Sequence, residues 1–329
     1  MRQLMISLDK KILDPSSAVA KRMVENGKTG ELYIIVPDVA SREVVLSPTV
    51  RVYSSGGQSK FGQWGQLYDL GEKLIKEHAI ETITVQDPFF IGLIGVWLRN
   101  QFKIALEVQL HGDFFGNNYY RFKSGPLNHL RWHIGKYVVH RADAVRVVGE
   151  RVKKSIIALG INAERITVKP VAIRELSETQ VSLRQKFPAA GKIFLVLGRL
   201  DPVKNIPWLI RVFVEVIKNQ PNHLLLIVGS GGDEGNIRNI IAKNKLEKNV
   251  VLEAWTNDPD SYLKVADCLL FPSLSEGYGL VAMEARAVGT PIIMNNVGVA
   301  NYELKPSNTV KILSINDKEK WIKAILNSF

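Results

Sequence analysis

Residues 193–219 read IFLVLGRLDPVKNIPWLIRVFVEVIKN, and this stretch decides the fold. Five consecutive apolar residues, Ile193–Leu197, predict a strand that is buried on both faces, as in a parallel sheet. A polar loop with Gly198 and Pro202 follows, and from Ile206 to Asn219 the apolar residues recur at helical spacing. A buried strand, a short loop and an amphipathic helix form the repeating unit of an α/β protein with a parallel sheet.

The same alternation extends through the rest of the chain. Apolar, β-branched runs predict strands at Gln3–Leu8, Glu31–Val36, Thr82–Gln86, Ile104–Leu110, Ala144–Val148, Ile166–Val168, Leu224–Val228, Val250–Leu252, Cys268–Phe271 and Pro291–Met294. Further helices are predicted at Asn236–Asn244, Gly279–Ala287 and Lys318–Leu326. The series restarts at Ile193 after a weakly patterned stretch, Ala172–Gly191. We therefore expect two Rossmann-like, doubly wound parallel-sheet domains, residues 1–175 and 176–329, facing a cleft that holds the ligands.

The bulk composition is that of a globular protein, with 46% hydrophobic and 23% charged residues. The single cysteine, Cys268, lies in an apolar run, so we expect a buried thiol and no intramolecular disulfide. Arg2, Asp9 and Lys10 interrupt any apolar leader, and the longest apolar run, Phe89–Leu98, is too short to span a bilayer. We expect a cytoplasmic protein, with peripheral contact at the inner face of a membrane.

The charge is positive and uneven. The net charge is +11, and residues 1–175 hold 25 Lys and Arg against 17 Asp and Glu. Two interpretations stay open for the basic segment 121–154: a solvated helical face, or a surface for an anionic lipid or a phosphorylated acceptor. Its basic residues are Arg121, Lys123, Arg131, Lys136, Arg141, Arg146, Arg151, Lys153 and Lys154. No nucleic-acid recognition motif accompanies them, so no nucleic-acid partner is expected.

The loop from Gly198 to Asn205 carries two cations, Arg199 and Lys204, between a strand and a helix. A guanidinium fork and a lysine point charge beside a helix N-terminus suit a diphosphate. Two solvated loop cations are the simpler alternative.

A second loop, Pro272–Leu280, follows the strand Cys268–Phe271. Gly277 and Gly279 allow close backbone approach at a helix start, where N–H groups are available to an anion. Glu276 on this loop and Glu284 in the following helix are placed to accept hydrogen bonds from sugar hydroxyls.

At these residues the chain resembles a known family. Leu197–Asn205 is similar to the phosphate loop of the retaining family-4 glycosyltransferases with the GT-B fold, and Pro272–Ala285 with Gly289–Ile293 resembles their paired-glutamate signature. The resemblance implies that Arg199 and Lys204 neutralise a donor diphosphate, that Glu276 contacts the transferred sugar and that Glu284 binds the ribose. It also implies a nucleotide pocket completed by Gly198, Gly229, Ser230, Ala254, Trp255, Gly277, Gly279 and Leu280.

Two rival motifs overlap this region. Gly229, Gly231 and Gly235 nearly spell a dinucleotide fingerprint, but the third glycine comes one position late. Asp258 and Asp260 form an acidic pair of the kind that holds a metal. Because a helix is predicted to begin near Ser261, helix-start electrostatics explains the pair more simply. We expect no metal and no cofactor.

The first half offers fewer candidates. His111 follows a predicted strand, and the resemblance implies a place near the transferred sugar, so we expect a catalytic or sugar-contacting role. Asp87 and Asp113 follow strand ends and are acceptor-side candidates. Where relatives carry paired glycines after the first strand, this chain has Asp9–Pro15.

We therefore expect a retaining hexosyltransferase that uses a UDP-, GDP- or ADP-sugar and a lipid-linked or saccharide acceptor. Its catalytic residues would be His111, Arg199, Lys204 and Glu276. A sugar-nucleotide epimerase or hydrolase with the same fold, and a non-catalytic nucleotide-sugar-binding protein, remain alternatives.

Overall fold

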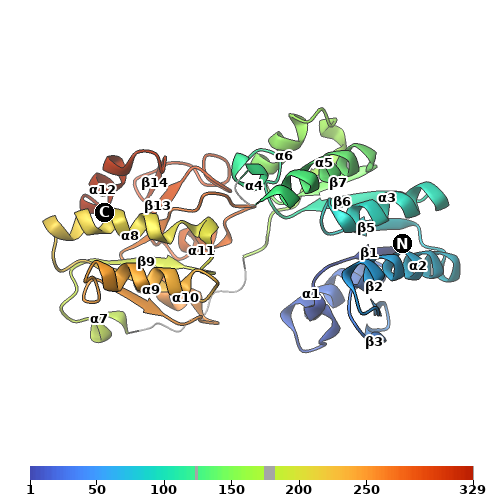
Figure 1. The fold of residues 1–329 in the computed structure, drawn as a ribbon, viewed down its shortest axis with the longest axis horizontal. Helices are drawn as coiled ribbons and strands as arrows, with labels where there is room; N and C mark the ends of the chain where they lie inside the picture. Colours follow the sequence, from blue (N-terminus) through green and yellow to red (C-terminus); the bar gives the residue numbers. More distant parts are fainter. Residues whose placement is uncertain (123–124, 174–181, 329) are drawn as a thin grey trace. The chain divides into compact units, whose positions relative to one another are not determined.

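The computed structural model describes residues 1–122, 125–173 and 182–328 (Figure 1). The chain forms two compact units. The first holds Met1–Val148 and Val152–Lys169, and the second holds Gly149–Arg151 and Pro170–Phe329. The expected boundary between residues 175 and 176 lies outside the described residues.

The first unit is built on one sheet with the strand order β3-β4-β2-β1-β5-β6-β7-β8. All neighbours in it are parallel except β3 and β4, which pair antiparallel. The parallel strands therefore end at one common edge. The strands are β1 (Arg2–Ile6), β2 (Glu31–Val36), β3 (Ser41–Ser47), β4 (Val50–Ser55), β5 (Thr82–Val85), β6 (Ala105–Leu110), β7 (Ala144–Val147) and β8 (Ile166–Val168).

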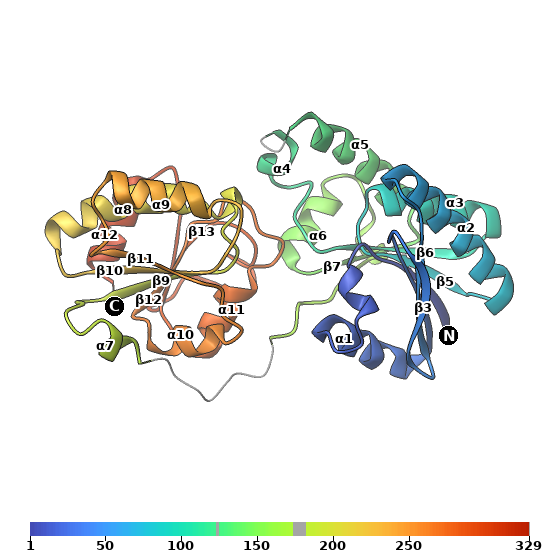
Figure 2. The same cartoon turned by 60° about the horizontal axis from the view of Figure 1, so that its bottom comes forward.

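Helices cover both faces of this sheet. Figure 2 shows α2 and α3 on one face and α1 on the other, and α5 packs beside α3 on the α2–α3 side. The helices are α1 (Ala18–Asn26), α2 (Lys60–His78), α3 (Phe90–Phe102), α4 (Asn118–Phe122), α5 (Pro126–Arg141) and α6 (Glu150–Ile157), with 3-10 turns η1 (Lys10–Leu13), η2 (Gly27–Thr29) and η3 (Ala163–Arg165).

The second unit has its own parallel sheet with the order β11-β10-β9-β12-β13-β14. Strand β9 pairs with β10 on one side and with β12 on the other, so the direction of the strand order reverses at β9. Such a switch point is where α/β sheets bind ligands. The strands are β9 (Ile193–Leu197), β10 (Leu224–Val228), β11 (Val250–Glu253), β12 (Cys268–Phe271), β13 (Ile292–Asn295) and β14 (Val310–Leu313).

Helices α8, α9 and α12 lie on one face of the second sheet, and α10 and α11 lie on the other (Figure 2). Phe194 on β9 packs against Phe213 of α8, and Trp208 of α8 meets the fully buried Trp321 of α12 edge to face. The helices are α7 (Leu183–Lys186), α8 (Ile206–Asn219), α9 (Glu234–Lys243), α10 (Pro259–Val265), α11 (Leu280–Ala287) and α12 (Lys318–Leu326), with the 3-10 turn η4 (Pro202–Lys204).

The predicted α/β architecture is confirmed, and several details are corrected. The predictions missed β3, β4 and β14, because strands with charged residues such as Arg42, Arg51 and Lys311 contain no long apolar run. Several predicted ends differ by one or two residues, as for β1, β6, β7, β13, α9 and α11. Helix α10 begins at Pro259 rather than near Ser261, since proline suits the first helical turn. None of the helices in the described ranges is long and apolar enough to cross a bilayer.

Candidate active site

The loops after β9, β10 and β11 are joined at the carboxyl edge of the second sheet. The amide of Leu200 donates to Ser230 at 2.9 Å, and that of Gly229 donates to the carbonyl of Glu253 at 3.1 Å. A Cβ atom on Gly229 would lie 1.9 Å from the carbonyl oxygen of Gly198. Glycine at position 229 therefore permits these loops to touch, and it brings the predicted residues Gly198, Gly229 and Ser230 together.

The predicted cation Lys204 meets the predicted carboxylate Glu276. The Lys204 Nζ lies 2.6 Å from Glu276 Oε1, and the two side chains are 19% and 14% exposed. Asn205 adopts a left-handed conformation with a φ of 56°, which ends η4 and starts α8. The amide of Leu274 donates to Val203 at 2.8 Å and so fixes the β12 loop against the β9 loop.

Arg199 lies on the same loop but is far more exposed. Its side chain is 73% exposed and pairs with Asp201 at 3.2 Å. Such a surface pair contributes little to stability. The Arg199 guanidinium is therefore easily drawn to another anion.

Glu284 is buried within α11, where it is 4% exposed. This helix starts at Gly279, whose φ of 98° suits glycine, and continues through Leu280. The first N–H groups of a helix have no intrahelical acceptor and favour an anion. Gly277 precedes them on the same loop. The predicted paired glutamates thus lie on either side of a helix start, one on the loop and one inside the helix.

The residues predicted to lie beside the nucleobase are open to solvent. Ala254 and Trp255 are both exposed, and the indole Nε1–H of Trp255 donates to Asn257 at 3.3 Å. Sequence reasoning missed the preceding residue, Glu253. Its carboxylate accepts from Tyr262 Oη at 2.8 Å and pairs with Lys186 at 2.6 Å. Glu253 could have been singled out from the sequence, because it ends a strand directly before Ala254 and Trp255.

In the first unit, His111 follows β6 at the carboxyl edge of the sheet. The residue is exposed, yet desolvation by the surrounding protein lowers the pKa of the imidazole. The charges of Arg146 and Arg22 lower this pKa further. The lowered pKa favours the neutral imidazole, which can accept a hydrogen bond. Sequence reasoning named neither Arg22 nor Arg146 as a neighbour of His111.

The two acceptor-side carboxylates have different surroundings. Asp87 follows β5, the strand next to β6, and accepts from the amide of Phe89 at 2.8 Å. Burial raises the pKa of Asp87, although the Phe89 amide and the charge of Arg131 oppose the shift. Asp113 is 7% exposed and accepts from the amide of Gly116 at 2.9 Å, so its carboxylate closes a turn.

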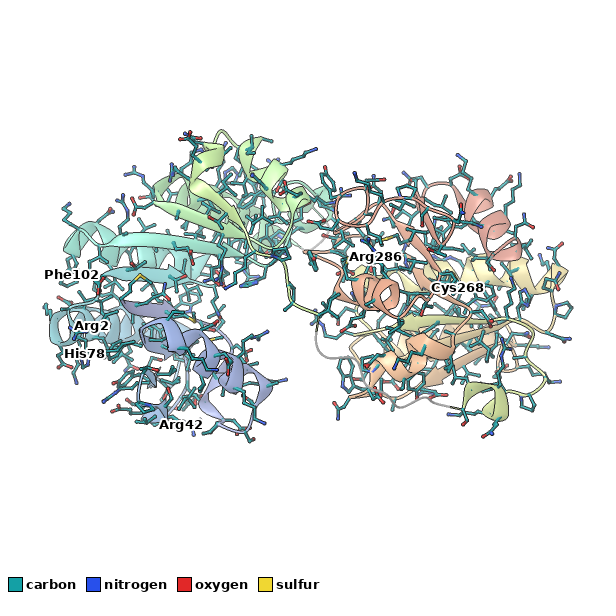
Figure 3. All side chains as sticks on the ribbon, turned by 180° about the vertical axis from the view of Figure 1, so that it is seen from behind. Arg2, Arg42, His78, Phe102, Cys268 and Arg286 are labelled. Carbon is teal, nitrogen blue, oxygen red and sulfur yellow. The ribbon has the colours of Figure 1, made fainter. Side chains whose placement is uncertain are left out.

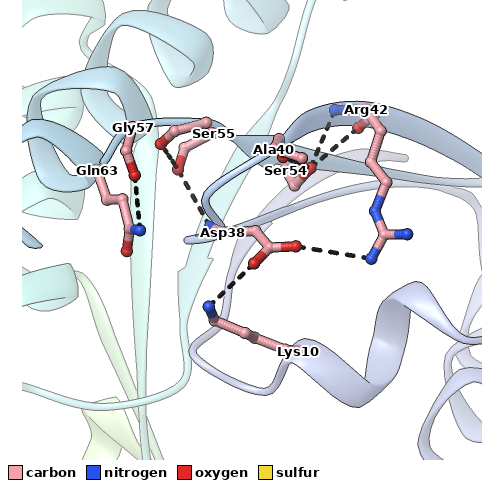
Figure 4. A network of polar contacts seen from close by, with 9 residues as sticks. Lys10, Asp38, Ala40, Arg42, Ser54, Ser55, Gly57 and Gln63 are labelled. Carbon is pink, nitrogen blue, oxygen red and sulfur yellow. Dashed lines mark hydrogen bonds and ion pairs between the residues drawn. The ribbon is translucent and has the colours of Figure 1, made fainter. Parts of the chain in front are cut away.

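The loop after β1 is held by charge. Figure 4 shows Asp38 between Lys10, at 3.0 Å, and Arg42, at 3.6 Å. The hydrogen bond from Lys10 lowers the pKa of Asp38. A pair of glycines that ends at Gly57 follows β4. The Gly57 carbonyl accepts a hydrogen bond from the Gln63 side chain at 2.9 Å (Figure 4). These glycines belong to the strand two places away from β1.

The described cations of the basic segment 121–154 have different partners. Arg151, which groups with the second unit, donates to Gly298, Asn296 and Ala300 at 2.6–2.8 Å. The Arg151 guanidinium therefore fixes the loop that contains these three residues. In α5, by contrast, Arg131, Lys136 and Arg141 lie over aromatic rings.

The chain is similar in sequence to several glycosyltransferases. An uncharacterized glycosyltransferase of Haemophilus influenzae is 35% identical over 226 residues, which are 68% of this chain and 59% of that protein. The alpha-monoglucosyldiacylglycerol synthase of Streptococcus pneumoniae is 26% identical over 241 residues, 67% of this chain and 53% of the relative. The Escherichia coli UDP-Gal:alpha-D-GlcNAc-diphosphoundecaprenol alpha-1,3-galactosyltransferase is 28% identical over 177 residues, 53% of this chain and 44% of the relative. The chain spans about half the length of these relatives.

Solved structures share the fold. Sucrose-phosphate synthase from Thermosynechococcus elongatus matches with a TM-score of 0.77 and 19% identity, over 99% of this chain and 89% of that one. The lipopolysaccharide outer core galactosyltransferase WaaB matches with a TM-score of 0.70 and 15% identity, with the same coverage. The fold is therefore GT-B.

Family profiles cover both units. The profile of "Glycosyltransferase Family 4" matches residues 19–174, and that of "Glycosyl transferases group 1" matches residues 180–327. The second range contains the Lys204–Glu276 pair and Glu284. The chain therefore belongs to the group 1 and family 4 glycosyltransferases of the GT-B fold.

Proposed function

We propose that the protein transfers a hexosyl unit from a nucleoside-diphosphate sugar to a hydroxyl acceptor with retention of configuration. The observation that carries this proposal is the Lys204–Glu276 pair on two loops at the switch point of the second sheet. Two relatives support it, because their names specify alpha-linked products or alpha-transfer.

The chemical role of the second unit follows from charge. Negative charge develops on the departing diphosphate, and preorganised cations and helix-start amides stabilise it. In this proposal Lys204, Arg199 and the amides at Gly279 and Leu280 supply that stabilisation without a metal ion. Glu276 accepts from the sugar hydroxyls, and Glu284 accepts from the ribose. The Trp255 ring lies beside the base.

The first unit would bind the acceptor. We assign His111 to the transferred sugar, as a neutral hydrogen-bond acceptor, and Asp87 to the acceptor hydroxyls. The acceptor is a lipid-linked molecule or a saccharide, reached by peripheral contact with an anionic membrane, because the first half of the chain carries most of the positive charge.

A thermal-shift screen of UDP, GDP, ADP and their sugar conjugates, with and without EDTA, tests the donor assignment. A nucleotide that binds only the folded chain raises the melting temperature with concentration. We expect one base to dominate, the shift to survive EDTA, and Glu284→Gln to weaken it. No shift with any nucleotide would overturn the proposal, and a shift that EDTA abolishes would overturn the metal-free form.

A further inference from the structure

An apolar pocket lies between α2 and α3 in the first unit, apart from the residues assigned above. Its volume is about 380 Å³. Trp64 and Tyr68 of α2 line one side, and Phe90, Leu93 and Trp97 of α3 line the other. Asp69 contributes the acidic side chain among the lining residues.

The aromatic rings around this pocket contact one another in pairs and are partly open to water. Trp64 stacks on Phe90 with ring centroids 4.4 Å apart, and Tyr68 meets Trp97 edge to face at 6.4 Å. The Trp97 side chain is nevertheless 53% exposed. Tryptophan and tyrosine are the residues that proteins place at the boundary between lipid and water, because one end of each ring is apolar and the other polar.

Helix α5 continues the apolar surface beside α3. Leu127, Leu130 and Tyr137 are 51%, 53% and 44% exposed, and their spacing of three and seven residues places them along one helical stripe. The Arg131 guanidinium lies 5.9 Å from the centre of the Phe90 ring, which joins this helix to the pocket. The exposed apolar residues of α5 and the pocket therefore belong to neighbouring elements of one helix layer.

The charge of α5 defines the partner. Its sequence contains Arg131, Lys136 and Arg141 and no Asp or Glu. In the described part of the chain, no ion pair joins any of these three cations to a carboxylate. Arg131 is near enough to Asp87 to lower the pKa of that carboxyl. A helix that combines exposed leucines with two cations outside any such ion pair, Lys136 and Arg141, matches the chemistry of an anionic lipid surface.

We propose that this docking face, made of Trp64, Tyr68, Phe90, Trp97, Leu130 and Tyr137, binds an anionic lipid bilayer. Lipid hydrocarbon enters the α2–α3 pocket, the Trp97 ring lies at the headgroup level, and Lys136 and Arg141 contact lipid phosphates. The inference extends the membrane contact of the proposed function by assigning it to a surface. It requires no donor chemistry and is measured without any nucleotide.

The test is sedimentation of the full chain with vesicles of phosphatidylcholine alone or mixed with phosphatidylglycerol. We expect binding to the anionic vesicles that weakens as salt rises. The double variant Trp97→Ser, Leu130→Ser should lower the partition coefficient about tenfold or more, because both side chains lose apolar burial. The matched control is the double variant Val45→Ser, Ile157→Ser, since these side chains are 60% and 40% exposed outside the docking face and the variant should leave vesicle binding unchanged.

A second pair of variants tests the charge. Lys136→Gln, Arg141→Gln should weaken binding to anionic vesicles roughly tenfold, whereas Lys218→Gln, Lys320→Gln removes the same charge from ion-paired sites and should not. Equal binding to neutral and anionic vesicles, or full binding by Trp97→Ser, Leu130→Ser, would overturn the proposal. Self-association through this face, seen by light scattering and abolished by the same variant, would also overturn it. Loss of nucleotide shifts with retained vesicle binding would instead count against the proposed function alone.

Discussion

The Lys204 ammonium lies 2.6 Å from the Glu276 carboxylate, and each side chain is less than one-fifth exposed. The two residues are 72 positions apart and come from loops after the neighbouring strands β9 and β12. A partly buried pair must satisfy both charges, so removing one partner leaves the other uncompensated. A bound diphosphate would compete for Lys204 and free Glu276 to accept from a sugar hydroxyl.

The first prediction concerns this pair. Lys204→Ala should lower kcat/KM by about 10²–10³, the loss typical of one preorganised donor that stabilises developing charge. Arg199→Ala should cost less, because its side chain is 73% exposed. Steady-state kinetics with the nucleotide sugar identified by thermal shift would measure both.

The control for this prediction is Lys218→Ala. Lys218 pairs with Glu215 at 2.9 Å on the surface of α8, and its loss should change kcat/KM less than twofold. Near-normal turnover by Lys204→Ala would remove Lys204 from the proposed phosphate clamp.

The second prediction concerns the contact between the β9 and β10 loops. Gly229→Ala should lower the melting temperature and abolish the nucleotide shift, since its Cβ would lie 1.9 Å from the Gly198 carbonyl oxygen. Gly235→Ala is the matched control, because nothing lies within 4 Å of its Cβ position. Alanine in place of this glycine of α9 should raise the free energy of unfolding by up to about 0.5–1 kcal/mol. A stable, nucleotide-binding Gly229→Ala variant would contradict this account of the loop contact.

Much of the fold followed from local pattern. The range Ile206–Asn219 of α8 was predicted to the residue, because a glycine and proline loop precedes it and its apolar spacing is strong. Strand β3 was missed, because Ser41–Ser47 is largely exposed at a sheet edge and carries Arg42 and Glu43. Its pairing with β4 depends on tertiary contacts that a short polar window does not encode.

The site divides in the same way. The strand-end positions of Lys204 and Glu276 were readable in sequence, but their contact depends on β9 and β12 being neighbours. The surroundings of His111 show the limit of sequence reasoning. Arg146 acts on it from β7, the next strand, and Arg22 acts from α1, at sequence separations that no local motif connects.

The third prediction concerns pH. Because the pKa of His111 is lowered, kcat/KM should be flat at neutral pH. It should fall only at pH values below about 6.5, the pKa of an ordinary imidazole, where His111 becomes protonated. His111→Gln should lower kcat/KM about tenfold to a hundredfold and remove this acidic limb. A limb that persists unchanged in His111→Gln would assign it to another group.

His223 provides the control. Desolvation and the charge of Lys192 lower its pKa also, while Asp267 opposes the shift. When a histidine stays neutral in the folded chain but is protonated in the unfolded chain, the folded state becomes less stable as the pH falls below about 6.5. His223→Gln should therefore change the pH dependence of the melting temperature and leave the acidic limb of kcat/KM in place.

The last prediction uses Cys268, labelled in Figure 3, as a reporter of donor binding. The thiol is fully buried on β12, and burial raises its pKa to about 12. Almost none of it is thiolate at pH 8, so a disulfide reagent should react only when the second unit opens. A nucleotide that binds the folded unit and is present at a hundred times its Kd should slow this reaction about a hundredfold, provided that reclosing is faster than labelling.

The labelling rate with and without nucleotide is followed by absorbance. Lys204→Ala should lose most of the protection, measured as the ratio of its own labelling rates without and with nucleotide. Rapid labelling of the native chain would contradict the burial of Cys268, whereas slow labelling that no nucleotide changes would place nucleotide binding outside the unit that contains β12.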